Sequence, residues 1–152
     1  MPPRSYGRFV AMVATSTLVM LALMYLNTYS VEHVYFSETR AFMALVMGAA
    51  MAVIMLAFMH HMYPRRASNV AIVVASVLVF AIALALVRTQ ATVGDVAWMK
   101  AMIPHHSIAI LTSERARITD PRVRKLADGI IATQRREIAE MKALIDDLER
   151  RR

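Results

Sequence analysis

The stretch that decides the fold is AFMALVMGAAMAVIMLAFMHHMY, residues 41–63. It contains no Asp, Glu, Lys or Arg. A helix needs about 20 apolar residues to cross a hydrocarbon core that is about 30 Å thick. The stretch meets that requirement, so it predicts a transmembrane helix.

Two further uncharged stretches lie on either side of it, FVAMVATSTLVMLALMYLNTY at residues 9–29 and VAIVVASVLVFAIALALV at residues 70–87. The first could also be a cleaved signal peptide, because Arg4 and Arg8 precede it. Its apolar run is too long for such a peptide, and no small-x-small cleavage pattern follows Asn27. We therefore predict an all-α protein with a three-helix membrane anchor at residues 1–93 and a separate domain at residues 94–152.

The net charge of +7 would suggest a nucleic-acid partner in a soluble protein. In a membrane protein, the distribution of Lys and Arg around the spans instead sets the orientation. Arg4, Arg8, Arg65 and Arg66 lie on one side of the predicted spans, against Arg40, Arg88 and Lys100 on the other. This count predicts a bacterial cytoplasmic membrane protein with a cytoplasmic N-terminus and an extracytoplasmic C-terminal domain. Membrane lipid, and not nucleic acid, is the expected partner.

The chain has 13 methionines and no cysteine. Disulfides and thiolate metal sites are therefore excluded. The thioether of Met is a soft, neutral ligand that suits Cu(I) or Ag(I). The alternative is that Met is a flexible residue that fills gaps in apolar cores.

Methionine recurs every four residues along the stretch 41–63, beside a row of small residues that allow close helix packing in lipid. The methionines are Met43, Met47, Met51, Met55 and Met59, and the small residues are Ala44, Gly48 and Ala52. The pattern favours a packed ridge over an ion path. The ridge ends in Met59, His60, His61 and Met62, which we treat as a possible second metal site or as residues of the membrane interface.

Residues 94–152 predict two helices. The first spans residues 95–118, with a kink expected at Pro104. The second begins after Asp120, a suitable N-cap, with Pro121 in its first turn, and extends to about residue 149. Because the turn between them is short, the helices should form an antiparallel hairpin. A single hairpin would leave an apolar stripe containing Ile130, Ile138 and Ile145 uncovered, which predicts a dimer.

The stretch WMKAMIPHHSIAI, residues 98–110, carries the chemistry of this domain. If the turn centres between residues 119 and 120, Met102 faces Glu137, His105 faces Gln134, and Met99 faces Glu140 or Met141. The proposed ligands are Met99, Met102, His105, His106, Glu137 and Met141, with Gln134 hydrogen bonded beside them. Imidazole must be neutral to bind a metal, so acid should weaken such a site. The alternative is a His pair that makes structural hydrogen bonds.

The run MIPHHSIAI, followed by Asp and Pro and then by LADGIIATQRREIAEM, resembles the DUF305 family over about residues 95–148. The resemblance implies a ferritin-like helical fold and an association with copper or silver. Its pattern falls on Met102, His105, His106, Gln134, Glu137 and Met141. Many soluble members carry two such hairpins, whereas this chain has one, so we expect two copies to complete a four-helix bundle.

These observations predict a membrane-anchored protein that binds Cu(I), with Ag(I) as its mimic and Cu(II) as a further candidate. Its role would be sequestration, tolerance, or handover to a copper-handling protein. We expect no enzymatic activity, because no nucleophile with its base and no glycine-rich phosphate loop is present. Two alternatives stay open: an assembly module whose hairpin only oligomerises, and a copper transport component whose route is the Met ridge and residues 59–62.

Overall fold

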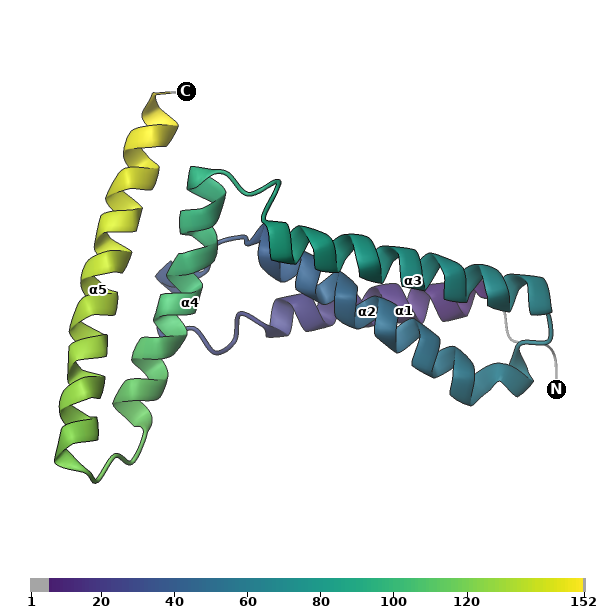
Figure 1. Cartoon of the computed structure of the whole chain (residues 1–152), viewed down its shortest axis with the longest axis horizontal. Coiled ribbons are helices and arrows are strands. Elements are labelled where there is room, and N and C mark those ends of the chain that lie inside the picture. The colour runs from purple at the N-terminus through teal and green to yellow at the C-terminus, as the bar shows by residue number, and fades with distance from the viewer. Residues whose placement is uncertain (1–5, 152) are drawn as a thin grey trace. The chain divides into compact units, whose positions relative to one another are not determined.

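A computed structural model describes residues 6–151, so Arg4, which contributed to the predicted orientation, and Arg152 lie outside the described residues. Every regular element in the described part of the chain is a helix, which confirms the all-α prediction (Figure 1). The elements in chain order are α1 (Tyr6–Leu23), η1 (Val31–His33), α2 (Glu38–Met59), η2 (His60–Met62), α3 (Arg66–Thr89), α4 (Asp95–Arg115) and α5 (Pro121–Arg150).

The chain divides into two compact units. The first contains the described part of Met1–Met24 together with Thr39–Thr92, and the second contains Tyr25–Glu38 together with the described part of Val93–Arg152. The units divide between Thr92 and Val93, beside the expected boundary at residue 94, and residues 25–38, which the prediction assigned to the anchor, group with the hairpin. One reason is that α1 ends at Leu23, whereas the predicted span extended to residue 29. Polar residues interrupt the apolar run between these two positions.

The first unit contains α1, α2 and α3, and all three helices are long and apolar enough to cross a membrane. The row of small residues on α2 is buried, as its spacing predicted, with Ala44 1% and Ala52 6% exposed. A Cβ atom added to Gly48 would lie 2.2 Å from Thr17 Oγ1. Helices α1 and α2 thus approach closely at Gly48, where a larger residue would require the Thr17 side chain to move.

One end of this unit is joined by aromatic and polar contacts. The Tyr6 hydroxyl donates to Asn69 Oδ1 at 2.9 Å, and Asn69 Nδ2 donates to Tyr63 O at 2.8 Å. The Phe9 and Tyr63 rings meet edge to face with centroids 5.3 Å apart, and both side chains are buried. These contacts tie the start of α1 to the connection between α2 and α3.

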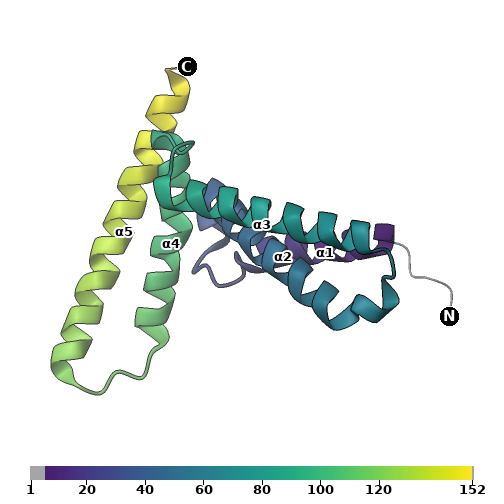
Figure 2. The ribbon, with the colours of Figure 1, turned by 45° about the vertical axis from the view of Figure 1, so that its right-hand side comes forward.

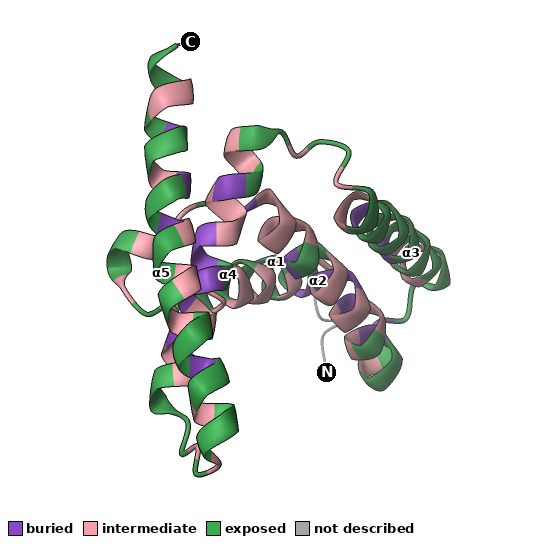
Figure 3. Cartoon of the chain, turned by 60° about the vertical axis from the view of Figure 1, so that its left-hand side comes forward, coloured by how far each residue is buried: buried purple, intermediate pink, exposed green. Residues whose placement is uncertain are grey.

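In the second unit, α4 and α5 lie side by side as an antiparallel hairpin (Figure 2). Asp120 caps α5 as predicted, because its Oδ1 accepts from the Arg122 backbone N–H at 2.8 Å. The buried residues of both helices face the seam (Figure 3). The apolar cluster at this seam consists of Met99, Ile103 and Ile110 from α4, and Ile138, Met141 and Ile145 from α5.

The apolar stripe expected to be uncovered is therefore mostly covered within one chain. Ile138 and Ile145 are only 4% and 3% exposed, so the prediction that they face a second copy is wrong. Helix α4 and the connection between α1 and α2 pack against them instead. Ile130, at 36%, is the member of the predicted stripe that stays exposed.

Candidate metal centre

The seam of the hairpin brings one histidine and one carboxylate together. His106 Nε2 lies 2.9 Å from Glu137 Oε2, and His106 Nδ1 lies 3.0 Å from Met102 O, one turn earlier on α4. His106 is buried, whereas the Glu137 side chain is 42% exposed. The pair therefore lies at the edge of the core, where solvent and ions can reach the Glu137 carboxylate.

The two contacts of His106 determine its chemistry. A backbone carbonyl only accepts hydrogen bonds, so Nδ1 must carry the hydrogen that it shares with Met102 O. A neutral ring then turns the lone pair of Nε2 toward the oxygen of Glu137. In that state Nε2 and Glu137 Oε2 form a nitrogen–oxygen pair 2.9 Å apart that can accept a cation, whereas a doubly protonated ring donates a hydrogen bond to Glu137. A backbone contact on the second ring nitrogen is the usual way to orient a metal-binding histidine.

Three thioether side chains lie in the surrounding core. Met99 and Met141 are 5% and 7% exposed and belong to the cluster of buried residues in the seam. Met102 is half-buried and packs against that cluster. Methionine side chains from both helices thus belong to the core of the hairpin, at whose edge the imidazole and the carboxylate lie.

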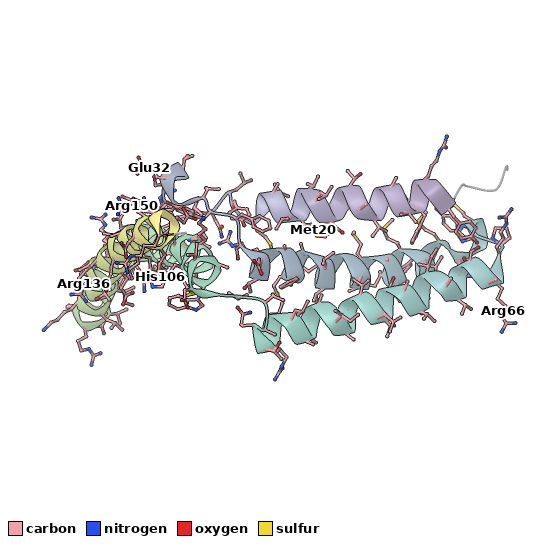
Figure 4. The ribbon with its side chains drawn as sticks, turned by 90° about the horizontal axis from the view of Figure 1, so that it is seen from above. Met20, Glu32, Arg66, His106, Arg136 and Arg150 are labelled. Carbon is pink, nitrogen blue, oxygen red and sulfur yellow. The ribbon has the colours of Figure 1, made fainter. Side chains whose placement is uncertain are left out.

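Of the predicted ligands, His105 lies apart from this pair. His105 is exposed, and its ring centroid is 6.1 Å from that of His106. Successive helical residues point about 100° apart, and Pro104 does not change this, because α4 continues through it. The structure therefore places only His106 in the seam. Figure 4 shows His106 within the hairpin and Arg136 on its outer surface.

The pairing across the seam also differs from the predicted one. Glu137 meets His106 and not Met102, a shift of about one helical turn. Helical side chains lean toward the N-terminus of their own helix, so the long Glu137 side chain reaches back along α5 toward the turn. Gln134 Oε1 is buried without a hydrogen-bond partner, although a hydrogen bond was expected for this side chain.

No group of three or more His, Cys, Asp or Glu side chains that could hold a metal occurs within residues 6–151. His106 and Glu137 supply two ligands of this kind. An ion at this place would need sulfur from Met102, Met99 or Met141 to complete its coordination, and such a set suits soft monovalent ions better than zinc or magnesium.

The predicted second site, residues 59–62, is divided by the structure. His60 and His61 are exposed, and His60 Nδ1 lies 3.0 Å from Ala57 O. Met59 and Met62 are half-buried and pack against the cluster that contains Phe9 and Tyr63. The imidazoles and the thioethers thus occupy different environments.

A contact that the sequence did not predict lies beside His106. The connection between α1 and α2, residues Tyr25–Glu38, packs against α4, and we call it the strap. The fully buried Ser107 Oγ accepts from the Tyr29 backbone N–H at 2.7 Å and lies 3.0 Å from His33 Nδ1. His33 is half-buried in this contact.

The strap also reaches α5. Lys142 Nζ lies 3.8 Å from Glu32 Oε2, and the Arg135 guanidinium lies 5.8 Å from the centre of the Tyr29 ring. Tyr35 packs against the core of the hairpin. The strap thus covers one flank of the hairpin. The sequence signal was weak: three tyrosines within a short connection, Tyr25, Tyr29 and Tyr35.

Acid should loosen the strap. Burial lowers the pKa of His33 below its usual 6.5, Lys142 lowers it further, and Glu32 opposes them. The unfolded chain therefore binds more protons than the folded one, so this contribution to stability is complete above pH 6.5 and is lost as the pH falls below it. We expect the midpoint of thermal unfolding in detergent to fall by a few degrees between about pH 7.5 and 5, and His33→Gln to remove that part of the slope. Identical slopes in both proteins would contradict the assignment.

Comparisons with known proteins find a family match over the part of the chain that contains α4 and α5. The family described as "Domain of unknown function (DUF305)" matches residues 84–152. An uncharacterized protein of Acanthamoeba polyphaga mimivirus, L153, is 44% identical over 63 residues, which make up 40% of this chain and 41% of the viral protein. The chain thus spans about two fifths of the length of that relative. No solved structure matches.

Proposed function

We propose that this protein is a membrane-anchored copper-binding protein that holds Cu(I) at the hairpin for sequestration, tolerance or handover. His106 Nε2 and Glu137 are the nitrogen and oxygen ligands, and Met102, with Met99 or Met141, supplies sulfur. His105 is not a member of this set, because it lies on the exposed side of α4.

The observation that carries the proposal is an oriented imidazole beside a carboxylate at the edge of a methionine-containing core. When Met102 O holds the hydrogen of Nδ1, the Nε2 lone pair of a neutral ring lies 2.9 Å from a carboxylate oxygen, and a bound cation would take the place of a second ring proton. The methionines of the hairpin core favour Cu(I) and Ag(I), and imidazole and carboxylate also accept Cu(II).

The three apolar helices support a membrane anchor. The arginine distribution of the sequence supports a cytoplasmic N-terminus and an extracytoplasmic hairpin, in the bacterial cytoplasmic membrane. Copper that is held there could pass to a copper-handling partner protein.

Titration of the full chain in detergent tests the proposal. Cu(I) under reducing, oxygen-free conditions, Ag(I), Cu(II) and Zn(II) are each added in competition with a chromophoric chelator of known affinity. We expect Cu(I) and Ag(I) to bind at least about a hundredfold more tightly than Zn(II), because thioether ligands discriminate between soft and borderline ions. Equal affinities, or no binding of Cu(I), would refute the proposal and support the alternative of an assembly module.

A further inference from the structure

One flank of α5 is apolar and uncovered. Its exposed side chains are Val123 at 49%, Leu126 at 65%, Ile130 at 36% and Leu144 at 46%. A groove of about 600 Å³ lies along the first half of this flank and is lined by Leu126, Gly129, Ile130 and Thr133, among others. A Cβ atom added to Gly129 would meet nothing within 4 Å, so the groove is open.

The direction of this flank follows from helical geometry, in which each residue turns about 100° from the last. Ile138 and Ile145 face α4, and Lys142 and Arg135 lie on the side of the strap. Leu126 and Leu144 point about 100° from Ile138 and Ile145, away from the strap. A helix with one neighbour on its inner side and a second at roughly a right angle has the geometry of a corner helix in a four-helix bundle.

Charge along α5 is divided between its two halves. Residues 121–136 contain Arg122, Arg124, Lys125, Arg135 and Arg136 against one acidic residue, Asp128. Residues 137–150 contain Glu137, Glu140, Asp146, Asp147 and Glu149 against two basic residues, Lys142 and Arg150. A second copy of α5 fits this pattern only when it runs antiparallel, because a parallel copy would place like charges together.

We infer that two copies of the chain associate through this flank of α5, antiparallel, about a two-fold axis near residues 135 and 136. Centred there, Leu126 of each copy meets Leu144 of the other, and Ile130 lies between them and the axis. The basic start of each helix lies beside the acidic end of its partner. Two hairpins then form the four helices of one bundle, as an isologous pair.

This inference rests on the proposed function and extends it, because the pairing changes the surroundings of the metal centre. Glu137 and Gln134 lie close to the two-fold axis, so each copy helps to cover the other's site. The association needs no metal, so it can be tested in a chelator, and its failure would leave the titration of copper unaffected.

Disulfide crosslinking of the full chain in detergent tests the pairing, since the natural sequence has no cysteine. The double variant Leu126→Cys with Leu144→Cys should form a covalent dimer on mild oxidation. The two positions are about 27 Å apart along one helix, so they cannot join within a chain. We expect at least about tenfold more dimer than with either single variant, because like positions are too far apart across an antiparallel pair to bond.

The matched control is Asp128→Cys with Asp146→Cys, which has the same separation along α5 but points away from the flank. It should give as little dimer as the single variants. Crosslinking by Leu126→Cys alone would show a parallel pair, and equal crosslinking by the control would show random collision. Either result overturns the inference.

A charge exchange provides a second measurement that leaves the apolar residues in place. Lys125 of one copy lies near Asp147 of the other in the inferred register. Lys125→Glu and Asp147→Lys should each lower the dimeric fraction seen by light scattering, and the combination should restore it. Additive losses in the combined variant would contradict the inferred register.

Discussion

His106→Leu should lower the affinity of the full chain for Cu(I) by about a hundredfold or more, whereas His105→Leu should leave it nearly unchanged. The two residues are adjacent, identical in type and on the same helix. They differ in that His106 is buried against Glu137, and His105 is exposed. Losing a partner that only orients a ligand already costs 10- to 100-fold, so losing the ligand itself should cost at least as much.

The measurement is competition against a Cu(I) chelator in detergent, with helix content checked by circular dichroism. Met102→Leu should give an intermediate loss, because it removes one sulfur and keeps the shape of an apolar side chain. If His105→Leu weakens binding as much as His106→Leu, copper is held on the outside of α4. If neither change matters, the His106–Glu137 pair is a structural contact and not a metal centre.

Ser107→Ala should release the strap, at a cost of about 1–3 kcal/mol to the free energy that holds it in place. The hydroxyl is fully buried and serves two strap groups, the Tyr29 backbone N–H and His33 Nδ1. Alanine leaves that N–H without its partner in a part-buried contact, which costs more than the loss of an ordinary surface hydrogen bond. Cys is a poor substitute, because its sulfur accepts hydrogen bonds only weakly.

Hydrogen exchange of the strap amides, followed by mass spectrometry in detergent, measures this effect. The Tyr29 amide should exchange at least about fivefold faster in Ser107→Ala. Thr112→Ala is the matched control, because the Thr112 hydroxyl is also on α4 but donates only to carbonyls of its own helix, Ile108 O and Ala109 O. Equal protection of the strap in all three proteins would show that its contacts with α5 and the packing of Tyr35 hold it without Ser107.

Local patterns in the sequence were sufficient for the helical architecture. The uncharged apolar stretches predicted three helices able to cross a membrane, and the structure contains them. Asp120 and Pro121 predicted the start of α5, because a cap and a fixed φ angle act on the backbone next to them. The buried row of Ala44, Gly48 and Ala52 followed from spacing in the same way. Each of these features depends on residues that are close together along the chain.

Only the tertiary structure decided which side chains meet. Sequence spacing placed His105 and His106 together, but a continuous helix turns one inward and the other outward. The lean of Glu137 along α5 shifted the pairing by one turn, and a count from the turn does not contain that lean. Ser107 contacts Tyr29, which is 78 residues earlier in the chain. Contacts over such separations depend on where whole elements pack, and a short polar connection carries no periodic pattern from which its packing could be read.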